Sequence, residues 1–110
     1  MITMRLDGAL IDGWPAFHRE SRRAFGLPDF YGNNMDAWID CLSTLRDPDD
    51  EGMTGFRLQP DETARIEVVN SADLRRRHPD IVEALEDGVA FCNDTYREVG
   101  EPPALELVFL

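Results

Sequence analysis

The chain has 110 residues, which is enough for one domain with a hydrophobic core and too few for two. Its composition, 43% hydrophobic and 30% charged, is typical of a folded globular protein and excludes a largely disordered chain. The formal net charge of −11 disfavours binding to nucleic acid or to an anionic membrane surface and favours association with a cationic partner.

The first predicted elements are a strand and a helix. Residues 2–6 alternate apolar and polar side chains, which predicts a short β-strand. Apolar residues then recur at helical spacing between Asp12 and Phe25, and Gly26 is a typical residue to end that helix. His18 lies on the apolar face of this helix, so we expect a core residue rather than a catalytic one.

A compact loop over residues 27–33 follows, because the proline, glycine and asparagine residues within it favour turns. Phe30 and Tyr31 are adjacent aromatic residues in this loop. We expect one ring to pack inward and the other to remain exposed as an anchor for a protein partner.

The next helix begins near Asn34, because asparagine is a good N-cap residue. Its apolar residues share one face and predict the side that packs on the core: Trp38, Cys41, Leu42 and Leu45. Its other face carries the residues that we expect to be accessible to a partner: Asp36, Ile39, Asp40 and Ser43.

Asp36 and Asp40 stand four residues apart, so their carboxylates are neighbours on one side of the helix. Two like charges in this arrangement destabilise a helix by about 0.2–0.5 kcal/mol, so folding does not require them. A cationic partner would explain them, and the isoleucine between them, Ile39, would add apolar contact area. A pair of catalytic carboxylates would instead lie in a cleft that separates their pKa values.

The middle of the chain, residues 46–62, interrupts the helical pattern. Its acidic first half predicts a solvated loop, and Phe56 and Leu58 predict a short additional strand near residues 55–59. Residues 65–70 are rich in β-branched side chains and predict a strand.

Two helices and a final strand complete the pattern. Asn70-Ser71 is expected to cap a short helix that ends in three arginines at Arg77, where cations favour the helix dipole. A longer helix is predicted from Pro79 to about Val99, with Gly88 marking a close approach to another element. Its buried side should consist of Ile81, Leu85, Val89, Cys92 and Tyr96, flanked by Val82 and Phe91. Residues 104–110 are almost entirely apolar and predict a mostly buried strand.

The predicted order is therefore strand, helix, helix, strand, helix, helix, strand. Strands that alternate with helices indicate an α/β domain over residues 1–110, with a three-stranded parallel sheet and about four helices.

Several functional classes are excluded by what the sequence lacks. No glycine-rich phosphate loop, metal-ligand cluster or nucleophile motif is present, so we expect no cofactor, no metal and no enzymatic activity. Cys41 and Cys92 fit no disulfide framework and are expected to be buried free thiols. With no signal peptide and no transmembrane segment, the predicted location is the cytoplasm, with a monomer as the simplest free state.

One stretch resembles a known family. Residues 27–42, Leu-Pro-Asp-Phe-Tyr-Gly-Asn-Asn-Met-Asp-Ala-Trp-Ile-Asp-Cys-Leu, resemble the signature of the barstar family, whose members inhibit the ribonuclease barnase. The resemblance implies a barstar-like fold and a protein that plugs the active site of a ribonuclease. The helix and the loop before it would carry the contact, with helix carboxylates in the place of substrate phosphate.

The resemblance also implies roles for individual residues. Asp40 would be the main phosphate mimic and Asp36 its neighbour. The remaining contacts would come from Phe30, Gly32, Met35, Ala37 and the position of Ile39. Tyr31 of the loop and Ser43 of the outer helix face complete the predicted partner surface by their place in the sequence pattern. Ile39 stands where the family carries a tryptophan, and Phe30 replaces a tyrosine and so lacks its hydroxyl group. An additional acidic contact late in the last helix would fall at Asn93 or Asp94.

Two other functions remain compatible with the sequence. The same surface would also serve an immunity protein or adaptor that binds a different toxin or another basic protein. A small carboxylate-dependent hydrolase would require Asp36 and Asp40 to lie in a deep cleft.

Overall fold

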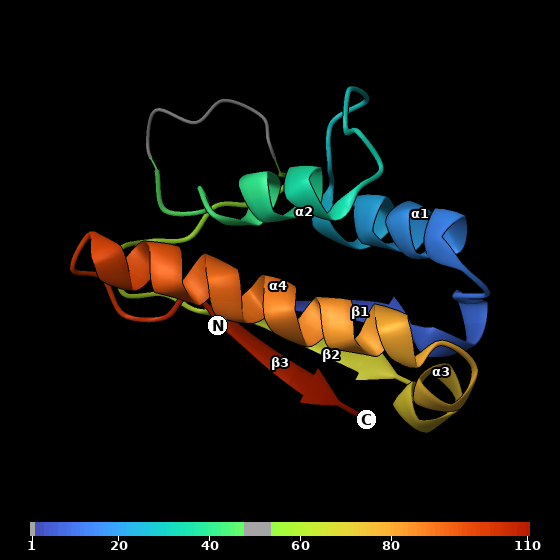
Figure 1. Cartoon of the computed structure of the whole chain (residues 1–110). Helices are drawn as coiled ribbons and strands as arrows, with labels where there is room; N and C mark the ends of the chain where they lie inside the picture. The colour runs from blue at the N-terminus through green and yellow to red at the C-terminus, as the bar shows by residue number, and fades with distance from the viewer. Residues whose placement is uncertain (1, 48–53) are drawn as a thin grey trace.

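The computed structural model describes residues 2–47 and 54–110 and confirms the predicted α/β architecture (Figure 1). The elements, in chain order, are β1 (Ile2–Asp7), the short 3-10 helix η1 (Gly8–Leu10), α1 (Trp14–Phe25), α2 (Met35–Leu42), β2 (Ala64–Val69), α3 (Ser71–Arg77), α4 (Pro79–Glu98) and β3 (Leu105–Phe109). The order of the three strands and four α-helices is the predicted one. Helix α2 and the loop before it lie at the top of the molecule in Figure 1, away from the sheet.

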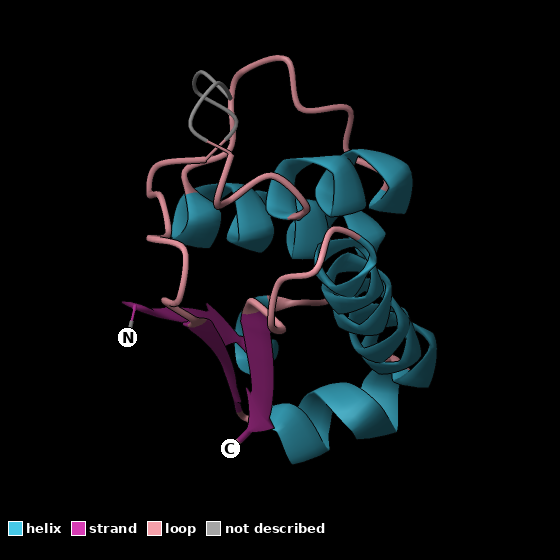
Figure 2. Cartoon of the chain, turned by 90° about the vertical axis from the view of Figure 1, so that its left-hand side faces the viewer, coloured by secondary structure: helices cyan, strands magenta, loops and turns pink. Residues whose placement is uncertain are grey.

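The sheet has the order β1-β2-β3, with both pairs of neighbouring strands parallel. One face packs on the helices through buried residues of all three strands: Met4, Leu6, Ala64, Ile66, Val68 and Leu105. The other face is mainly polar and carries ion pairs from Arg5 to Glu67 and from Arg65 to Glu106. Figure 2 shows the helices above and to the right of the strands, with the left side of the sheet uncovered.

This one-sided packing corrects the prediction for the last strand. Leu105 is buried, but Leu107, Val108 and Phe109 are only half-buried. The apolar run of β3 resembles a strand covered on both faces, which is the usual arrangement in parallel sheets. Here β3 is an edge strand of a sheet with helices on one face, so part of each side chain remains exposed.

Helix α1 covers the outer edge of β1 with a charged pair. The backbone N–H of Asp7 donates to a carboxylate oxygen of Glu20 over 3.0 Å, and the Arg23 guanidinium donates to the carbonyl oxygen of Arg5 over 3.0 Å. Arg23 also donates to Glu20, and this hydrogen bond lowers the pKa of the Glu20 carboxyl. The pair satisfies backbone groups of β1 that would otherwise be open to pairing with another chain.

The additional strand predicted near residues 55–59 is not formed, so that prediction is wrong. The backbone N–H of Gly55 donates to Phe25 at the end of α1, and the N–H of Leu58 donates to Leu45 just after α2. This segment therefore crosses the ends of two helices instead of joining the sheet. Residues 48–53, which include most of the predicted acidic loop, lie outside the described residues.

Helix α3 has the predicted extent but a different beginning. Asn70 adopts a left-handed conformation with φ of 55°, and its side chain makes no capping hydrogen bond. Its amide instead donates to a carboxylate oxygen of Asp7 at 2.8 Å. At the other end, Arg77 donates to the carbonyl oxygens of Gly8 and Ile11, so this basic run is part of the fold.

The core lies between the inner face of the sheet and helices α1, α2 and α4. Its largest fully buried side chains are Trp38, Phe17 and Phe25. The buried side of α4 is the predicted one, except that Phe91 is 59% exposed. Within the described residues, no helix is both long and apolar enough to cross a membrane.

Candidate functional site

Helix α2 is fixed at both of its ends. At the N-terminus, the Asn34 side chain accepts a hydrogen bond from the backbone N–H of Ala37 at 2.8 Å, which confirms the predicted N-cap. At the other end, the hydroxyl group of Tyr96 in α4 donates to the carbonyl oxygen of Leu42 and accepts from the N–H of Leu45, each over 2.9 Å. Both hydrogen bonds are buried, so α4 determines where α2 ends.

The inner face of α2 rests on α1 and α4. The Trp38 indole N–H donates to the Ser21 hydroxyl of α1 over 3.2 Å. Gly88 of α4 lies directly beneath α2: a Cβ atom there would be 3.1 Å from both the Met35 methyl group and the Trp38 ring. This contact confirms the close approach predicted at Gly88.

The outer face of α2 carries the two carboxylates. Asp36 and Asp40 are both exposed, and neither accepts a hydrogen bond or joins an ion pair within the described residues. Since they are four residues apart on one helix, their Cβ atoms are about 5–6 Å apart. Neither lies in the deep cleft that a carboxylate-dependent hydrolase would require.

The other predicted contacts on α2 are partly accessible. Met35, Ala37, Ile39 and Ser43 are half-buried, so each presents part of its side chain. Ile39 also packs against the core and is less exposed than its position between two aspartates suggests. The Ser43 hydroxyl lies 3.4 Å from the Cys92 sulfur of α4, so it is held against that helix.

The two aromatic residues of loop 27–33 have separate roles, as expected. Phe30 is 73% exposed, whereas Tyr31, predicted among the partner contacts, is 6% exposed. The Tyr31 hydroxyl lies 2.6 Å from the Nδ1 atom of His18 in α1, which confirms His18 as a core residue. Gly32 is exposed and packs closely on Asn34: a Cβ atom there would be 3.1 Å from the Asn34 amide nitrogen. Tyr31 therefore fixes the loop that presents Phe30.

The hydrogen bond between His18 and Tyr31 makes stability depend on pH. Burial lowers the pKa of His18 below its ordinary value of 6.5. Burial also raises the pKa of Tyr31, so its hydroxyl keeps its proton and can donate to a neutral Nδ1. An imidazolium carries N–H groups on both ring nitrogens and cannot accept that hydrogen bond.

We therefore expect the contribution of His18 to the free energy of unfolding to be constant above pH 6.5. It should then decrease as the pH falls through the lowered pKa, because the unfolded chain binds the proton more readily. Urea unfolding at several pH values would measure this, and His18→Gln should remove this part of the slope. Equal slopes for the two proteins would contradict this role of His18.

The structure distinguishes between the two residues considered for a late acidic contact. The Asn93 side chain accepts from the backbone N–H groups of Ala104 and Leu105 and donates to the Leu105 carbonyl oxygen. It therefore fixes the start of β3. Asp94 is exposed and pairs with Arg97, so it is the acidic group accessible on that turn of α4.

The thiols offer little chemistry at this surface. Cys41 and Cys92 are buried and form no disulfide, as predicted. Burial raises the pKa of Cys92 to about 11, and the nearby Asp40 carboxylate acts in the same direction, so the thiolate form is disfavoured. No cluster of three or more potential metal-ligating side chains occurs among the described residues.

Sequence reasoning missed the role of Tyr96. The helical pattern places it on the buried side of α4, but its hydroxyl partners are 51 and 54 residues away along the chain. A tyrosine on an otherwise apolar face is the one available signal, since a buried tyrosine hydroxyl usually has a hydrogen-bond partner.

The comparison with known protein families agrees with this geometry. A family model described as Barstar (barnase inhibitor) matches residues 1–108. No curated protein shows significant similarity to the chain. Since the match covers nearly the whole chain, including α2 and the loop before it, the protein belongs to the barstar family.

Proposed function

We propose that this protein inhibits a basic microbial ribonuclease of the barnase type by covering its active site with α2 and loop 27–33. The observation that carries the proposal is the pair of exposed carboxylates, Asp36 and Asp40, which have no hydrogen-bond or ion-pair partner among the described residues. They lie on a helix that is fixed at both ends, and the loop that leads into this helix exposes the ring of Phe30.

The chemistry of such a complex follows from what a ribonuclease must bind. Its active site holds cationic side chains for the substrate phosphate, and these form strong charge-assisted hydrogen bonds with carboxylates. Asp40 would take the place of the phosphate group and Asp36 would extend the same contact. The protein would be a binding partner and not a catalyst, since a phosphate mimic offers no bond to break.

The rigidity of the site also favours binding. Asn34, Tyr96 and Tyr31 each fix a part of this surface by hydrogen bonds in the free protein. Little conformational entropy is then lost when the complex forms, so more of the contact energy is retained as affinity. The exposed Phe30 and the half-buried Ile39 would supply apolar contact area to the complex.

The test of the function is an inhibition titration of purified barnase-type ribonucleases with this protein. A loss of activity that is complete at one equivalent supports the proposal. Full activity with every such enzyme, together with recovery of a different basic protein on co-purification from the source cell, would favour the immunity protein or adaptor.

The rate of association should depend strongly on salt. The chain carries a formal net charge of −11, and the long-range field of such a protein accelerates encounter with a cationic enzyme. Barnase with its own inhibitor is the standard example of such steering. We expect the association rate constant to fall steeply between low and physiological ionic strength, because the Debye length shortens to about 8 Å. Stopped-flow mixing would measure it, and a rate constant independent of salt would indicate a mainly apolar encounter.

A further inference from the structure

One arginine has no hydrogen-bond or ion-pair partner in the part of the chain that the structure describes. All 11 cationic side chains are arginines, and all of them lie within the described residues. Ten make a hydrogen bond or an ion pair, such as Arg77 with Asp73. Arg19 of α1 makes neither with any described residue, although acidic residues outnumber arginines two to one. An unpaired cation in so acidic a chain indicates a group that is available to an external anion.

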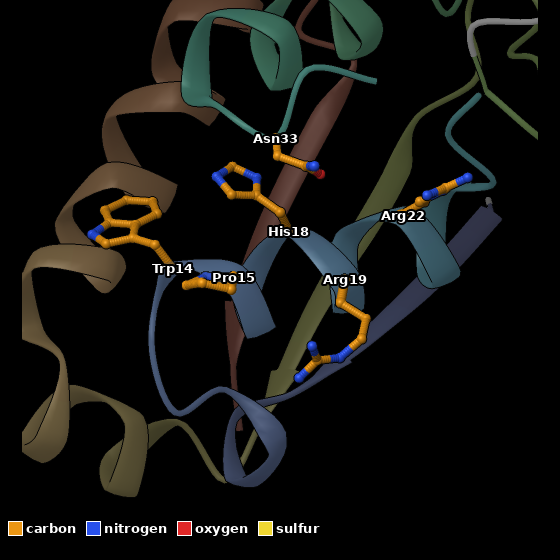
Figure 3. Close-up of a pocket in the computed structure, with 6 residues that line it drawn as sticks. All are labelled: Trp14, Pro15, His18, Arg19, Arg22 and Asn33. Carbon is orange, nitrogen blue, oxygen red and sulfur yellow. The ribbon is translucent and has the colours of Figure 1, made fainter. Parts of the chain in front are cut away.

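Arg19 lines a pocket on the surface of α1, next to loop 27–33 (Figure 3). The volume of the pocket is about 480 Å³. Its lining residues are Trp14, Pro15, His18, Arg19, Arg22 and Asn33. Figure 3 shows the Trp14 and His18 rings on one side, Asn33 above, and the two arginine side chains on the remaining sides.

The aromatic side of the pocket is fixed in position. The Trp14 indole N–H donates to the Asp80 carboxylate of α4 over 3.2 Å. The Trp14 and His18 rings stack with centroids 5.9 Å apart and an interplanar angle of 27°. The hydrogen bond between the Tyr31 hydroxyl and His18 then connects this wall to the loop. The pocket is thus formed in the free protein, so binding does not have to order it.

The two arginines differ in availability. Arg22 pairs with the Asp29 carboxylate of the loop, so its charge is largely compensated. Arg19 is exposed and has no carboxylate partner among residues 2–47 and 54–110, so its guanidinium N–H groups are available to donate. A carboxylate matches the planar guanidinium group of Arg19, because its two oxygen atoms can accept two parallel hydrogen bonds.

We propose that this pocket is a second contact for the target enzyme and that it receives a carboxylate side chain from a surface loop beside the enzyme's active site. The inference rests on the proposed function, because Asn33 belongs both to the pocket and to the loop that would dock. An enzyme seated on Phe30 and Asp36 would extend its surface over α1. The pocket then makes binding selective, since a ribonuclease without an acidic residue at that place loses the contact with Arg19.

The test compares Arg19→Gln with Arg76→Gln in binding to a barnase-type ribonuclease that the wild-type protein inhibits. Arg76 lies on α3, is exposed and pairs with Asp73, so both variants change the net charge equally. Both variants therefore have the same long-range attraction to the enzyme, and the difference between their affinities measures the local contact of Arg19. We expect Arg19→Gln to weaken binding by about five- to tenfold and Arg76→Gln to remain within about twofold of wild type.

The remaining outcomes are distinct. Wild-type affinity for Arg19→Gln, with weakened binding for Asp40→Ala, would overturn the second contact and leave the proposed function intact. Wild-type protein that binds no such enzyme would overturn both. NMR shifts of residues 14–22 on addition of inorganic phosphate or acetate to the free protein would identify a small-anion site instead. Circular dichroism checks that Arg19→Gln folds, which is expected for an exposed and unpaired side chain.

Discussion

Replacement of Asp40 by alanine is expected to weaken binding to the ribonuclease more than any other single substitution in α2. If Asp40 takes the place of the substrate phosphate, its removal leaves cationic groups of the enzyme buried without a partner. Such a truncation costs about 2–5 kcal/mol, which corresponds to at least a thirtyfold loss of affinity. Stopped-flow and calorimetric measurements should show that most of the loss lies in a faster dissociation.

The matched control for this variant is Asp61→Ala. Asp61 is exposed and belongs to the segment before β2, so its replacement removes the same charge from a residue that is not part of α2. Asp61→Ala should slow association slightly through the weaker field and leave the dissociation rate unchanged. If the two variants bind equally well, Asp40 contributes only through net charge and is not a phosphate mimic.

Replacement of Tyr96 by phenylalanine should cause a large loss of stability for the removal of one oxygen atom. The Leu42 carbonyl and the Leu45 N–H would both lose their buried partner. Each unsatisfied backbone group costs about 1–3 kcal/mol, so we expect a decrease of about 2–6 kcal/mol in the free energy of unfolding. Urea denaturation would measure it.

Tyr31→Phe supplies the comparison. It removes the hydroxyl of a second buried tyrosine, whose one hydrogen-bond partner among the described residues is His18. Its loss should be smaller, about 1 kcal/mol. Tyr96→Phe should in addition weaken binding to the ribonuclease, since the C-terminal end of α2 loses its fixed position near Asp40. A Tyr96→Phe variant as stable as Tyr31→Phe would contradict the role of Tyr96 as the cap of α2.

The order of elements could be predicted because the information for it is local. Hydrophobic periodicity gives the faces of α1 and α4, and Asn34 marks the start of α2 with a residue type that caps helices. Gly88 could also be interpreted from sequence, because a glycine within a helix is costly unless another element approaches it. The same local pattern distinguishes the outer face of α2 from its inner face.

The predictions that failed concern contacts between distant parts of the chain. Phe56 and Leu58 have strand-like spacing, but their segment packs on the ends of α1 and α2 instead. Asn70 is a suitable cap, yet its side-chain amide donates a hydrogen bond to Asp7, 63 residues earlier. Phe91 shows that an apolar residue at helical spacing can still lie outside the core.

The most direct test of the account is competition for the active site of the ribonuclease. Inhibition of the enzyme by this protein would be measured with increasing concentrations of a mononucleotide that occupies the phosphate site. If α2 covers that site with Asp40 and Asp36, the apparent inhibition constant should rise in proportion to the nucleotide concentration. An inhibition constant that does not change with nucleotide would show that the protein binds elsewhere on the enzyme and would contradict phosphate mimicry.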